Sequence, residues 1–384
     1  MTVGQPSPSE CRADPPDIAE VLPEAEPQNT EIEIPPPIVP VGKPEEKKLI
    51  TVYQHIIPTV GALVTFSMLG TLIRVQLNDL LSYPAAPIPA LLWSQMVGCF
   101  IMGVATKLKG PLTYYGSPAL FVGISTGLCG SITTFSSWQA EIFAEFYNTG
   151  RNPHNWFKNL LGGVSVIAVT LSVAIGADQF GRHLGTLAVQ VMSARLRTCK
   201  RFDDGGDVRN RLLYPHALMD WAMVAAATVG LTAVAVVVGL VPSTRSVGWA
   251  ILFGPAGAIS RWLLSPLNSY VGKSGGLAGT LPAGTFAANW VGSSLLAIWW
   301  MLQNGAVVRP PAITCSILSG LADGLCGCLT TVSTFVVELK ALPLQNSYWY
   351  FVASMVTAQA VWVLMPGIYF KRSGVDYPTC VLHS

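Results

Sequence analysis

The chain has 384 residues, of which 51% are hydrophobic and only 11% are charged. Soluble domains carry about 25% charged residues, so this composition excludes an ordinary water-soluble fold and indicates a protein of the lipid bilayer. The net charge of +2 does not indicate a nucleic-acid partner, and no basic patch alternates with aromatic residues as such a site requires. Residues 1–48 are rich in proline and glutamate, which predicts a disordered cytoplasmic tail.

Nine apolar segments are long enough to cross a bilayer, which takes about 20 mostly apolar residues. They cover residues 52–73, 90–106, 117–146, 157–177, 216–241, 247–265, 281–303, 312–339 and 347–370. The polar, basic stretch from Asp178 to Arg211 predicts a cytoplasmic loop over residues 179–215. Lys and Arg are concentrated in the loops that a cytoplasmic N-terminus places inside, so we expect an extracellular C-terminal tail over residues 372–384.

The eight cysteines give no disulfide pattern. Five of them lie in apolar runs, where a thiol usually behaves as a small hydrophobic group; they are Cys99, Cys129, Cys315, Cys326 and Cys328. The C-x-C pair Cys326 and Cys328 has no histidine near it and does not predict a metal site.

Three motifs occur twice in the same order and at similar spacing. They are Gly70-Thr-Leu-Ile-Arg74 with Gly257-Ala-Ile-Ser-Arg261, Gln95-Met-Val-Gly98 with Asn289-Trp-Val-Gly292, and the block from Gly127 to Glu141 with the block from Gly324 to Glu338. The chain therefore divides into two four-helix repeats, residues 49–178 and 247–371, with a linking span over 216–246. Because a single crossing separates them, the second repeat is predicted to be inverted. The predicted fold is an all-α membrane protein with nine transmembrane helices.

The third motif places Gly, Thr and Ser in the middle of an apolar span. Each glycine costs about 1 kcal/mol of helix propensity relative to alanine, so the helix is predicted to break near Gly130–Thr134 and near Gly327–Thr331. Freed carbonyl groups at membrane depth must be buried in protein or bind an ion, and oxygen ligands suit a hard cation such as Na⁺. Close packing of helices through small residues explains the same composition equally well.

Side chains after each break suit a small anion. The edge of an aromatic ring carries positive quadrupole character, although core packing is the ordinary role of an aromatic pair. The aromatic positions are Phe135 and Trp138 in the first half and Val332 and Phe335 in the second. Hydroxyl and amide donors accompany them, namely Thr133, Thr134, Ser136, Thr330, Thr331, Ser333, Gln95 and Asn289.

Two further pairs of charged residues occupy matched positions. Arg74 and Arg261 end apolar spans, where they can either snorkel to the membrane interface or line an anion-attracting vestibule. Glu141 and Glu338 lie at the far ends of the broken spans. We expect them to make contacts at the helix ends or between the two halves. Asp323 has no counterpart, because Thr126 occupies that position, and the sequence assigns it no role.

These motifs resemble the fluoride channel and exporter family, known as Fluc, CrcB or FEX proteins. The resemblance rests on Gly257-Ala-Ile-Ser-Arg261, on the segment from Gly284 to Ser293 and on the two Gly-x-Cys-Gly-x-x-Thr-Thr blocks, and it covers roughly residues 60–178 and 250–370. Bacterial members are four-helix subunits that form antiparallel dimers, and eukaryotic members are tandem fusions through a linking helix. The resemblance therefore implies passive fluoride export through pores beside the interface, in a plasma-membrane protein that functions as a monomer.

The resemblance also implies roles for individual residues. The expected fluoride pore contains Asn289, Phe135, Phe335, Thr134, Thr331, Ser136, Ser333, Thr357 and Ser354. The expected vestibules contain Arg74 and Arg261. A central structural Na⁺ would be held by the main-chain carbonyl groups of Gly130, Thr133, Gly327 and Thr330.

Three departures from the family pattern predict that only one pore conducts. Gln95 replaces an asparagine, and Val332 and Trp138 each replace a phenylalanine. With Ser165, these three would form a degenerate second pore, since Trp is bulky and Val offers no ring edge. A proton-coupled fluoride transporter is the alternative function, and Glu141 and Glu338 are its only paired carboxylates. The spans contain no constellation of residues that would indicate an enzyme.

Overall fold

The computed structural model describes residues 56–83, 88–150, 155–200, 213–270, 281–304, 310–373 and Cys380. The predicted N-terminal tail lies outside this part of the chain. Within it the regular elements are all helical, and no strand occurs. This part of the chain is therefore an all-α fold, as the apolar segments of membrane length predicted.

The first half contains four successive helical segments, the third of which is interrupted. Its elements are α3 (Ile57–Leu81), α4 (Ala90–Lys107), α5 (Lys109–Pro111), a π-turn (Leu112–Gly116), α6 (Pro118–Val122), a π-helical stretch (Gly123–Cys129), α7 (Gly130–Ile132), α8 (Phe135–Tyr147) and α9 (Trp156–Lys200). Helix α9 corrects the predicted loop over residues 179–215, because it continues through Lys200 without a break. Apolar residues continue on this helix beyond Asp178, among them Leu187 and Val191, and the stretch long and apolar enough to cross a membrane reaches Ala194.

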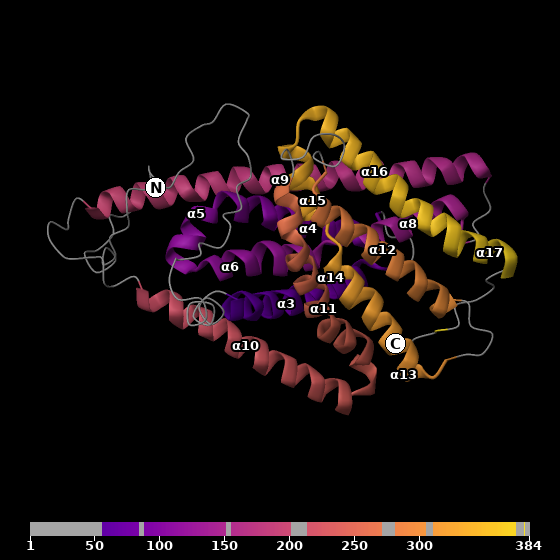
Figure 1. The fold of residues 1–384 in the computed structure, drawn as a ribbon, viewed down its shortest axis with the longest axis horizontal. Helices are drawn as coiled ribbons and strands as arrows, with labels where there is room; N and C mark the ends of the chain where they lie inside the picture. The colour runs from indigo at the N-terminus through magenta and orange to yellow at the C-terminus, as the bar shows by residue number, and fades with distance from the viewer. Residues whose placement is uncertain are drawn as a thin grey trace.

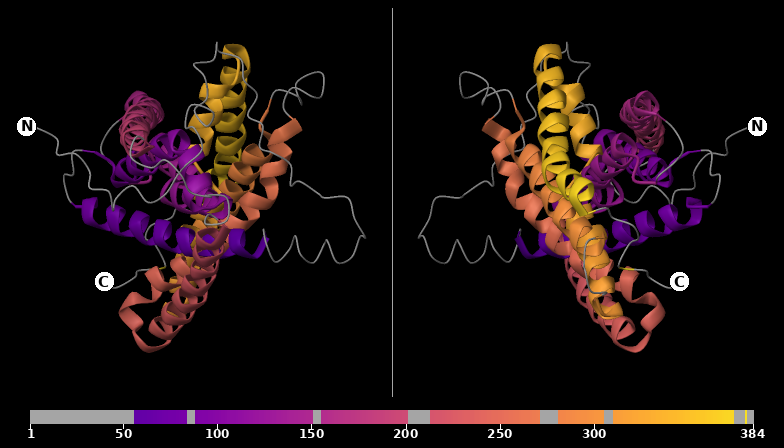
Figure 2. Two further views of the ribbon diagram at one scale, coloured as in Figure 1. Left: turned by 90° about the vertical axis from the view of Figure 1, so that its left-hand side faces the viewer. Right: turned by 90° about the vertical axis from the view of Figure 1, so that its right-hand side faces the viewer.

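The linking helix and the second half follow. Their elements are α10 (Leu213–Leu240), a 3-10 turn (Pro242–Thr244), α11 (Arg245–Leu264), a second 3-10 turn (Ser265–Tyr270), α12 (Ala283–Asn304), α13 (Ala312–Gly320), a π-helical stretch (Leu321–Cys326), α14 (Gly327–Leu329), α15 (Ser333–Ala341), α16 (Leu344–Trp362), a π-turn (Val363–Gly367) and α17 (Ile368–Ser373). Figure 1 shows α9 running almost the full length of the molecule, and in Figure 2 it is seen nearly end-on, with α16 and α10 at opposite ends of the bundle.

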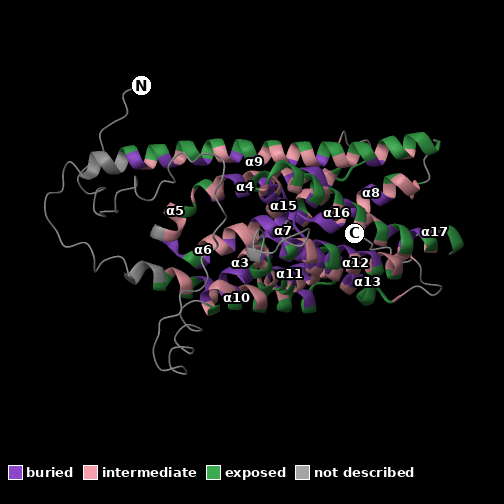
Figure 3. Ribbon diagram, turned by 45° about the horizontal axis from the view of Figure 1, so that its top comes forward, coloured by how far each residue is buried: buried purple, intermediate pink, exposed green. Residues whose placement is uncertain are grey.

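Eight helices of the described residues are long and apolar enough to cross a membrane. The expected span 281–303 forms helix α12 but is not one of the eight. It is uncharged and 22 residues long, and its polar residues, Asn289 among them, lower its hydropathy. Large apolar side chains are exposed along α9 and α10, including Leu187, Val191, Trp221 and Val229, and Figure 3 shows the exposed edge of α9. The chain is thus a multi-pass membrane protein whose outer faces suit lipid.

Helices α4 and α9 pack with their backbones in contact. A Cβ atom on Gly103 would collide with the carbonyl oxygen of Asp178, and one on Gly181 would collide with that of Phe100. Small residues permit this close approach, which is a common way for helices to associate in lipid. Little room for side chains is therefore left between these two helices.

A disulfide bond joins Cys315 near the start of α13 to Cys380. This corrects the prediction that Cys315 is a free apolar thiol. The two residues are 65 positions apart, so no local spacing pattern could reveal the pair. The backbone amide of Cys380 also donates to the carbonyl group of Gln303 at the end of α12.

Candidate functional site: the joint between the halves and the line of polar groups beside it

The third helix of each half is interrupted at its threonine pair. The backbone is extended at Thr133 and Thr134 before α8 begins, and it is extended again at Thr330 before α15 begins. Both interruptions fall inside the predicted intervals. Each leaves backbone groups at membrane depth that need partners, because lipid supplies none.

Hydroxyl groups from the opposite half satisfy the new helix starts. Oγ1 of Thr330 accepts from the backbone amides of Phe135 and Ser136, each at 3.1 Å. Oγ1 of Thr133 accepts from the amides of Val332 at 3.3 Å and Ser333 at 3.1 Å. Each threonine thus caps the helix of the other half in the manner of an N-cap residue.

The other predicted hydroxyl residues belong to the same joint. Thr134 and Ser136 lie within 3.0 Å of Oγ1 of Thr330, and Thr331 and Ser333 lie within 3.2 Å of Oγ1 of Thr133. The pore assignment rested on their motif alone. In the structure these hydroxyl groups bond mainly to one another across the halves.

The two amide side chains make equivalent clasps on the interrupted backbone. Nε2 of Gln95 donates to the carbonyl oxygen of Thr134 at 2.7 Å, and Oε1 accepts from its amide at 3.3 Å. Nδ2 of Asn289 donates to the carbonyl oxygen of Thr331 at 3.2 Å, and Oδ1 accepts from its amide at 2.8 Å. An amide nitrogen carries two N–H donors, so each clasp leaves one for another acceptor.

The paired arginines are buried at this joint, which corrects the vestibule and snorkelling assignments. Arg74 is 1% exposed and Arg261 is 5% exposed. Arg74 donates to the carbonyl groups of Ser131, at 2.9 Å, and Asp323. Asp323, which the sequence left without a role, therefore contributes a backbone acceptor.

Arg261 makes the matching contacts in the other direction. Its Nη1 donates to the carbonyl oxygens of Gly130 at 2.9 Å and Thr330 at 3.0 Å, and its Nη2 donates to that of Thr126. A guanidinium group suits this position because its donors lie in a fixed fork. Thr126 and Asp323 are thus equivalent acceptors despite their different side chains.

These contacts bear on the expected Na⁺ site. Main-chain carbonyl oxygens suit a hard cation, but Gly130 and Thr330 already accept hydrogen bonds from Arg261. Two of the four expected ligands are therefore engaged by a positively charged group of the chain itself. The residues in this arrangement do not fit a four-carbonyl cation site.

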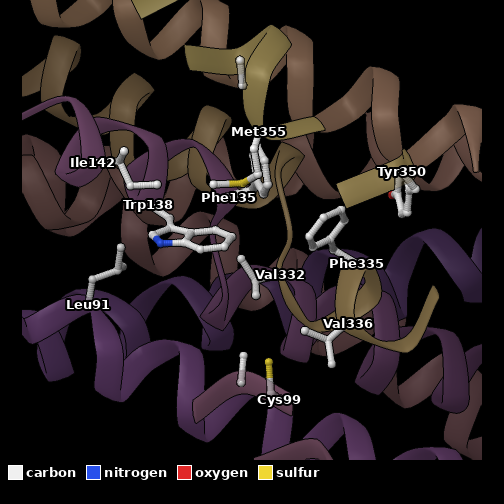
Figure 4. Packing of buried hydrophobic residues seen from close by; sticks show 12 residues of the cluster. Leu91, Cys99, Phe135, Trp138, Ile142, Val332, Phe335, Val336, Tyr350 and Met355 are labelled. Carbon is white, nitrogen blue, oxygen red and sulfur yellow. The ribbon is translucent and has the colours of Figure 1, made fainter. Parts of the chain in front are cut away.

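The aromatic positions lie in one buried cluster, and their neighbours differ. The ring of Phe335 lies 5.5 Å from that of Phe135 and 4.9 Å from that of Tyr350 on α16. Nε1 of Trp138 donates to the carbonyl oxygen of Val166 on α9 at 3.4 Å. Figure 4 shows Phe335 beside Tyr350, with Val332 between Phe335 and Trp138. Phe335 thus faces α16, whereas Trp138 faces α9.

Helices α8, α12 and α16 run side by side in the same direction. Near their starts, Glu338 accepts from Thr285 on α12 at 2.6 Å and from Tyr350 on α16 at 2.7 Å. Asn268 also donates to this carboxylate, at 3.0 Å. Near their ends, the ring of Trp362 lies 6.2 Å from that of Trp300 and 5.3 Å from that of Phe143.

A pair of glutamines joins α8 and α16 between these two ends. Nε2 of Gln359 donates to the carbonyl oxygen of Gln139 at 2.8 Å and to its Oε1 at 2.9 Å. Nε2 of Gln139 approaches the sulfur of Met355 at 3.2 Å. The motif analysis did not single out these residues, because Gln139 is matched by Val336 in the second block and Gln359 lies outside the matched blocks.

Four buried donors along α12 and α16 have no hydrogen-bond partner among the described residues: Oγ of Ser293, Nε1 of Trp299, Oγ of Ser354 and Nε1 of Trp362. Ser354 was predicted to line a pore, but Ser293 and Trp362 were not. Helical spacing gives a signal for both, since Ser293 follows Asn289 by four residues and Trp362 follows Ser354 by eight. Thr357 instead donates to the carbonyl oxygen of Ala353 in its own helix at 2.7 Å.

The corresponding group of α4, α9 and α15 has a different character. Ser165, expected in the second pore, is exposed on the outside of α9, which corrects that assignment. Asp178 of α9 is buried and pairs with Arg182 and Lys340, each at 2.8 Å. In the described parts of these three helices, the buried polar atoms that lack a partner are acceptor oxygens of Asn159 and Asp178 and include no donor.

Comparison with known proteins agrees with the duplicated motifs. The family model described as CrcB-like protein, Camphor Resistance (CrcB), matches residues 61–177 and again residues 248–368. Fluoride export protein 1 of Candida albicans is 29% identical over 84% of this chain and 83% of its own length. Fluoride export protein 1 of Saccharomyces cerevisiae is 28% identical over 85% of this chain and 96% of its own length.

A single-unit relative matches as well. Fluoride-specific ion channel FluC 1 of Staphylococcus epidermidis is 35% identical over 29% of this chain and 82% of its own length. No solved structure gives a significant match. The family model covers more than half of the chain in two copies, which confirms the resemblance read from the motifs. The chain therefore belongs to the CrcB-like fluoride channel and exporter family, with two copies of the family unit in tandem.

Proposed function

We propose that the chain is a passive fluoride channel that exports cytoplasmic fluoride through one conducting path, along α8, α12 and α16. The relatives named as fluoride export proteins span most of this chain and support fluoride as the ion. The observation that carries the path is the set of buried, unpartnered donors on α12 and α16. Such donors suit an anion that exchanges its water for a sequence of weak contacts.

The first contact we propose is Asn289, with Phe335 and Phe135 at the same level. The second N–H of the Asn289 amide can donate to fluoride while the first holds Thr331. The rings of Phe335 and Phe135, 5.5 Å apart, supply positive edges without a full charge. Weak, successive contacts permit conduction because the ion must leave each site as readily as it arrives.

The group of α4, α9 and α15 is proposed not to conduct. Trp138 is fully buried there, and the contact between α4 and α9 leaves little room. Asp178 pairs with both Lys340 and Arg182, so these two cations are engaged by a carboxylate and are not free to bind an anion. One molecule would therefore contain one conducting path, which fits function as a monomer.

The proposed topology has nine crossings, two inverted halves, a cytoplasmic N-terminus and an extracellular C-terminus in the plasma membrane. The Cys315–Cys380 disulfide supports the placement of the C-terminus, because disulfides persist on the oxidising side of a membrane. An inside-negative potential favours exit of an anion by about 2.3 kcal/mol per 100 mV. Because HF enters by diffusion and loses its proton in the cytosol, a passive pore suffices to clear fluoride.

Reconstitution into liposomes tests this function. Purified protein should release trapped fluoride from K⁺-loaded vesicles only when valinomycin carries the balancing charge. Chloride-loaded vesicles should release little anion under the same conditions. Fluoride release that does not require valinomycin would overturn the uncoupled channel.

One observation favours testing proton coupling as the second candidate. Glu338 is 8% exposed and lies one helical turn after Phe335, at the start of the proposed path. A coupled transporter would acidify or alkalise the vesicle lumen in step with fluoride, and Glu338→Gln would abolish that pH change. In the channel, fluoride release occurs without a matching proton flux.

A further inference from the structure

The unpartnered donors of α12 and α16 extend well beyond Asn289. Ser293 follows Asn289 by one turn on the same face of α12, and both are buried. Tyr350, Ser354, Ala358 and Trp362 recur at four-residue spacing on α16, and all four are buried. With a rise of 1.5 Å per residue, Trp362 lies about 12 Å beyond Ser354.

The two helices keep the same register along this length. Thr285 and Tyr350 meet at Glu338, and Trp300 and Trp362 meet near the other end. Asn289 follows Thr285 by four residues and Ser354 follows Tyr350 by four residues, so Asn289 and Ser354 lie at the same level. By the same register, Trp362 lies one to two turns beyond Ser293. Asn289, Ser293, Ser354 and Trp362 thus follow one another along a single seam between the two helices, and Trp299, the fourth unpartnered donor, lies outside this spacing.

Trp362 differs from the donors before it in its surroundings. It is 0% exposed, and its ring lies 5.3 Å from that of Phe143 and 6.2 Å from that of Trp300. The ring of Tyr147 in turn stacks on that of Phe143, at 4.5 Å. Its Nε1 has no hydrogen-bond partner among the described residues. A buried N–H group without a partner destabilises the fold, so a fold would ordinarily pair it or expose it.

We propose that Trp362 forms an outer anion site at the end of the fluoride path, where its indole N–H donates to fluoride between aromatic walls, and that Ser293 passes the ion to it from Asn289. This inference rests on the proposed function and adds two residues to it. The indole supplies a neutral donor, which holds an anion less tightly than an ammonium or guanidinium group would. The aromatic rings around it contribute positive edges and exclude bulk water.

Two variants with matched controls test the site by valinomycin-dependent fluoride release from liposomes. Trp362→Phe removes the N–H and keeps an aromatic ring, and Ser293→Ala removes one hydroxyl group. Trp249→Phe is the control for the first, because Nε1 of Trp249 is also buried and unpartnered but lies on α11. Ser294→Ala is the control for the second, because Ser294 donates to the carbonyl group of Trp290 in its own helix.

We expect Trp362→Phe and Ser293→Ala each to lower the release rate about tenfold, because each removes one hydrogen bond to a charged partner. Each should also raise the fluoride concentration at which release is half-saturated. Both controls should keep the wild-type rate. Wild-type rates from monodisperse Trp362→Phe and Ser293→Ala would overturn the outer site and leave the channel intact. Equal losses in variants and controls would also overturn it. If Trp362→Phe fails to fold, the release rate of the nearly isosteric Ser293→Ala variant decides whether the proposed site holds. Absence of shunt-dependent release from wild type would instead refute the proposed function.

Discussion

Thr330 caps the helix that begins at Phe135 in the other half of the molecule, and Thr133 returns the same contact to Ser333. These reciprocal caps tie the two interrupted helices together at the place where each needs a partner. Removing an N-cap side chain costs about 1 kcal/mol. The joint should therefore be sensitive to the loss of either hydroxyl group.

Thr330→Val and Thr133→Val should each lower the free energy of unfolding by about 1 kcal/mol, and more when combined. Valine keeps the shape of the side chain and removes the acceptor. Thermal unfolding in detergent measures the effect, with Thr228→Val in α10 as the control, because the Thr228 hydroxyl bonds only to carbonyl groups of its own helix. Unchanged unfolding of the double variant would remove the caps from the account of stability.

Asn289→Ala should lower fluoride release at least tenfold, because an anion loses a hydrogen bond of about 1.5–3 kcal/mol. The same change also frees the backbone of Thr331, so a second variant is needed. Asn289→Gln should preserve folding, since Gln95 makes the equivalent clasp on Thr134. A properly folded Asn289→Ala protein that releases fluoride at the wild-type rate would exclude this amide from the path.

Trp138→Phe should leave fluoride release within about twofold of wild type, whereas Phe335→Leu should lower it by up to tenfold. The ring of Phe335 faces the proposed path beside Tyr350, and an aromatic contact contributes about 0.5–1.5 kcal/mol. Trp138 instead donates to Val166 of α9. Similar losses in both variants would show that two paths conduct or that these aromatic residues are assigned to the wrong ones. Gln95→Ala is unsuitable here because it would leave the backbone of Thr134 unpaired.

Arg261→Ala should make the stability of the protein depend on Na⁺. In the wild type, the guanidinium group occupies the carbonyl oxygens of Gly130 and Thr330, so its unfolding temperature should be the same in NaCl and in choline chloride. The variant exposes these oxygens to a cation, and Na⁺ should then raise its unfolding temperature. Na⁺-dependent stability of the wild type would show that the ion competes successfully with Arg261.

Cys315 and Cys380 should react with a membrane-impermeant maleimide on intact cells only after an impermeant reductant is added outside. This follows if their disulfide lies on the extracellular face. In the test protein, Cys11 and Cys199 are replaced by serine. The control variant also carries Cys315→Ser and Cys380→Ser, and its labelling gives the background that comes from the four buried cysteines. Labelling that requires permeabilised cells would place the C-terminus in the cytoplasm.

Composition and repetition in the sequence determined the class and plan of this protein. A charged fraction of 11% and apolar segments of membrane length require a bilayer, and the doubled motifs predict two related halves. The threonine pairs marked where the helices break, because a glycine-rich, threonine-containing stretch forms a poor helix. These signals are local or periodic, so they can be read without coordinates.

Long-range pairing decided the rest. In the sequence, an arginine that snorkels to water from the end of an apolar span cannot be told from one that binds a distant carbonyl group. Arg261 is of the second kind, since it donates to a carbonyl group 131 residues away. The Cys315–Cys380 bond likewise joins residues that are 65 positions apart. The continuation of helix α9 through Lys200 depends on the surroundings of that helix, which its own sequence does not give. Whether the donor of Ser293 or Trp362 has a partner depends on what packs against it. Only the tertiary structure determines that, because burial turns an ordinary serine or tryptophan into a donor that needs a ligand.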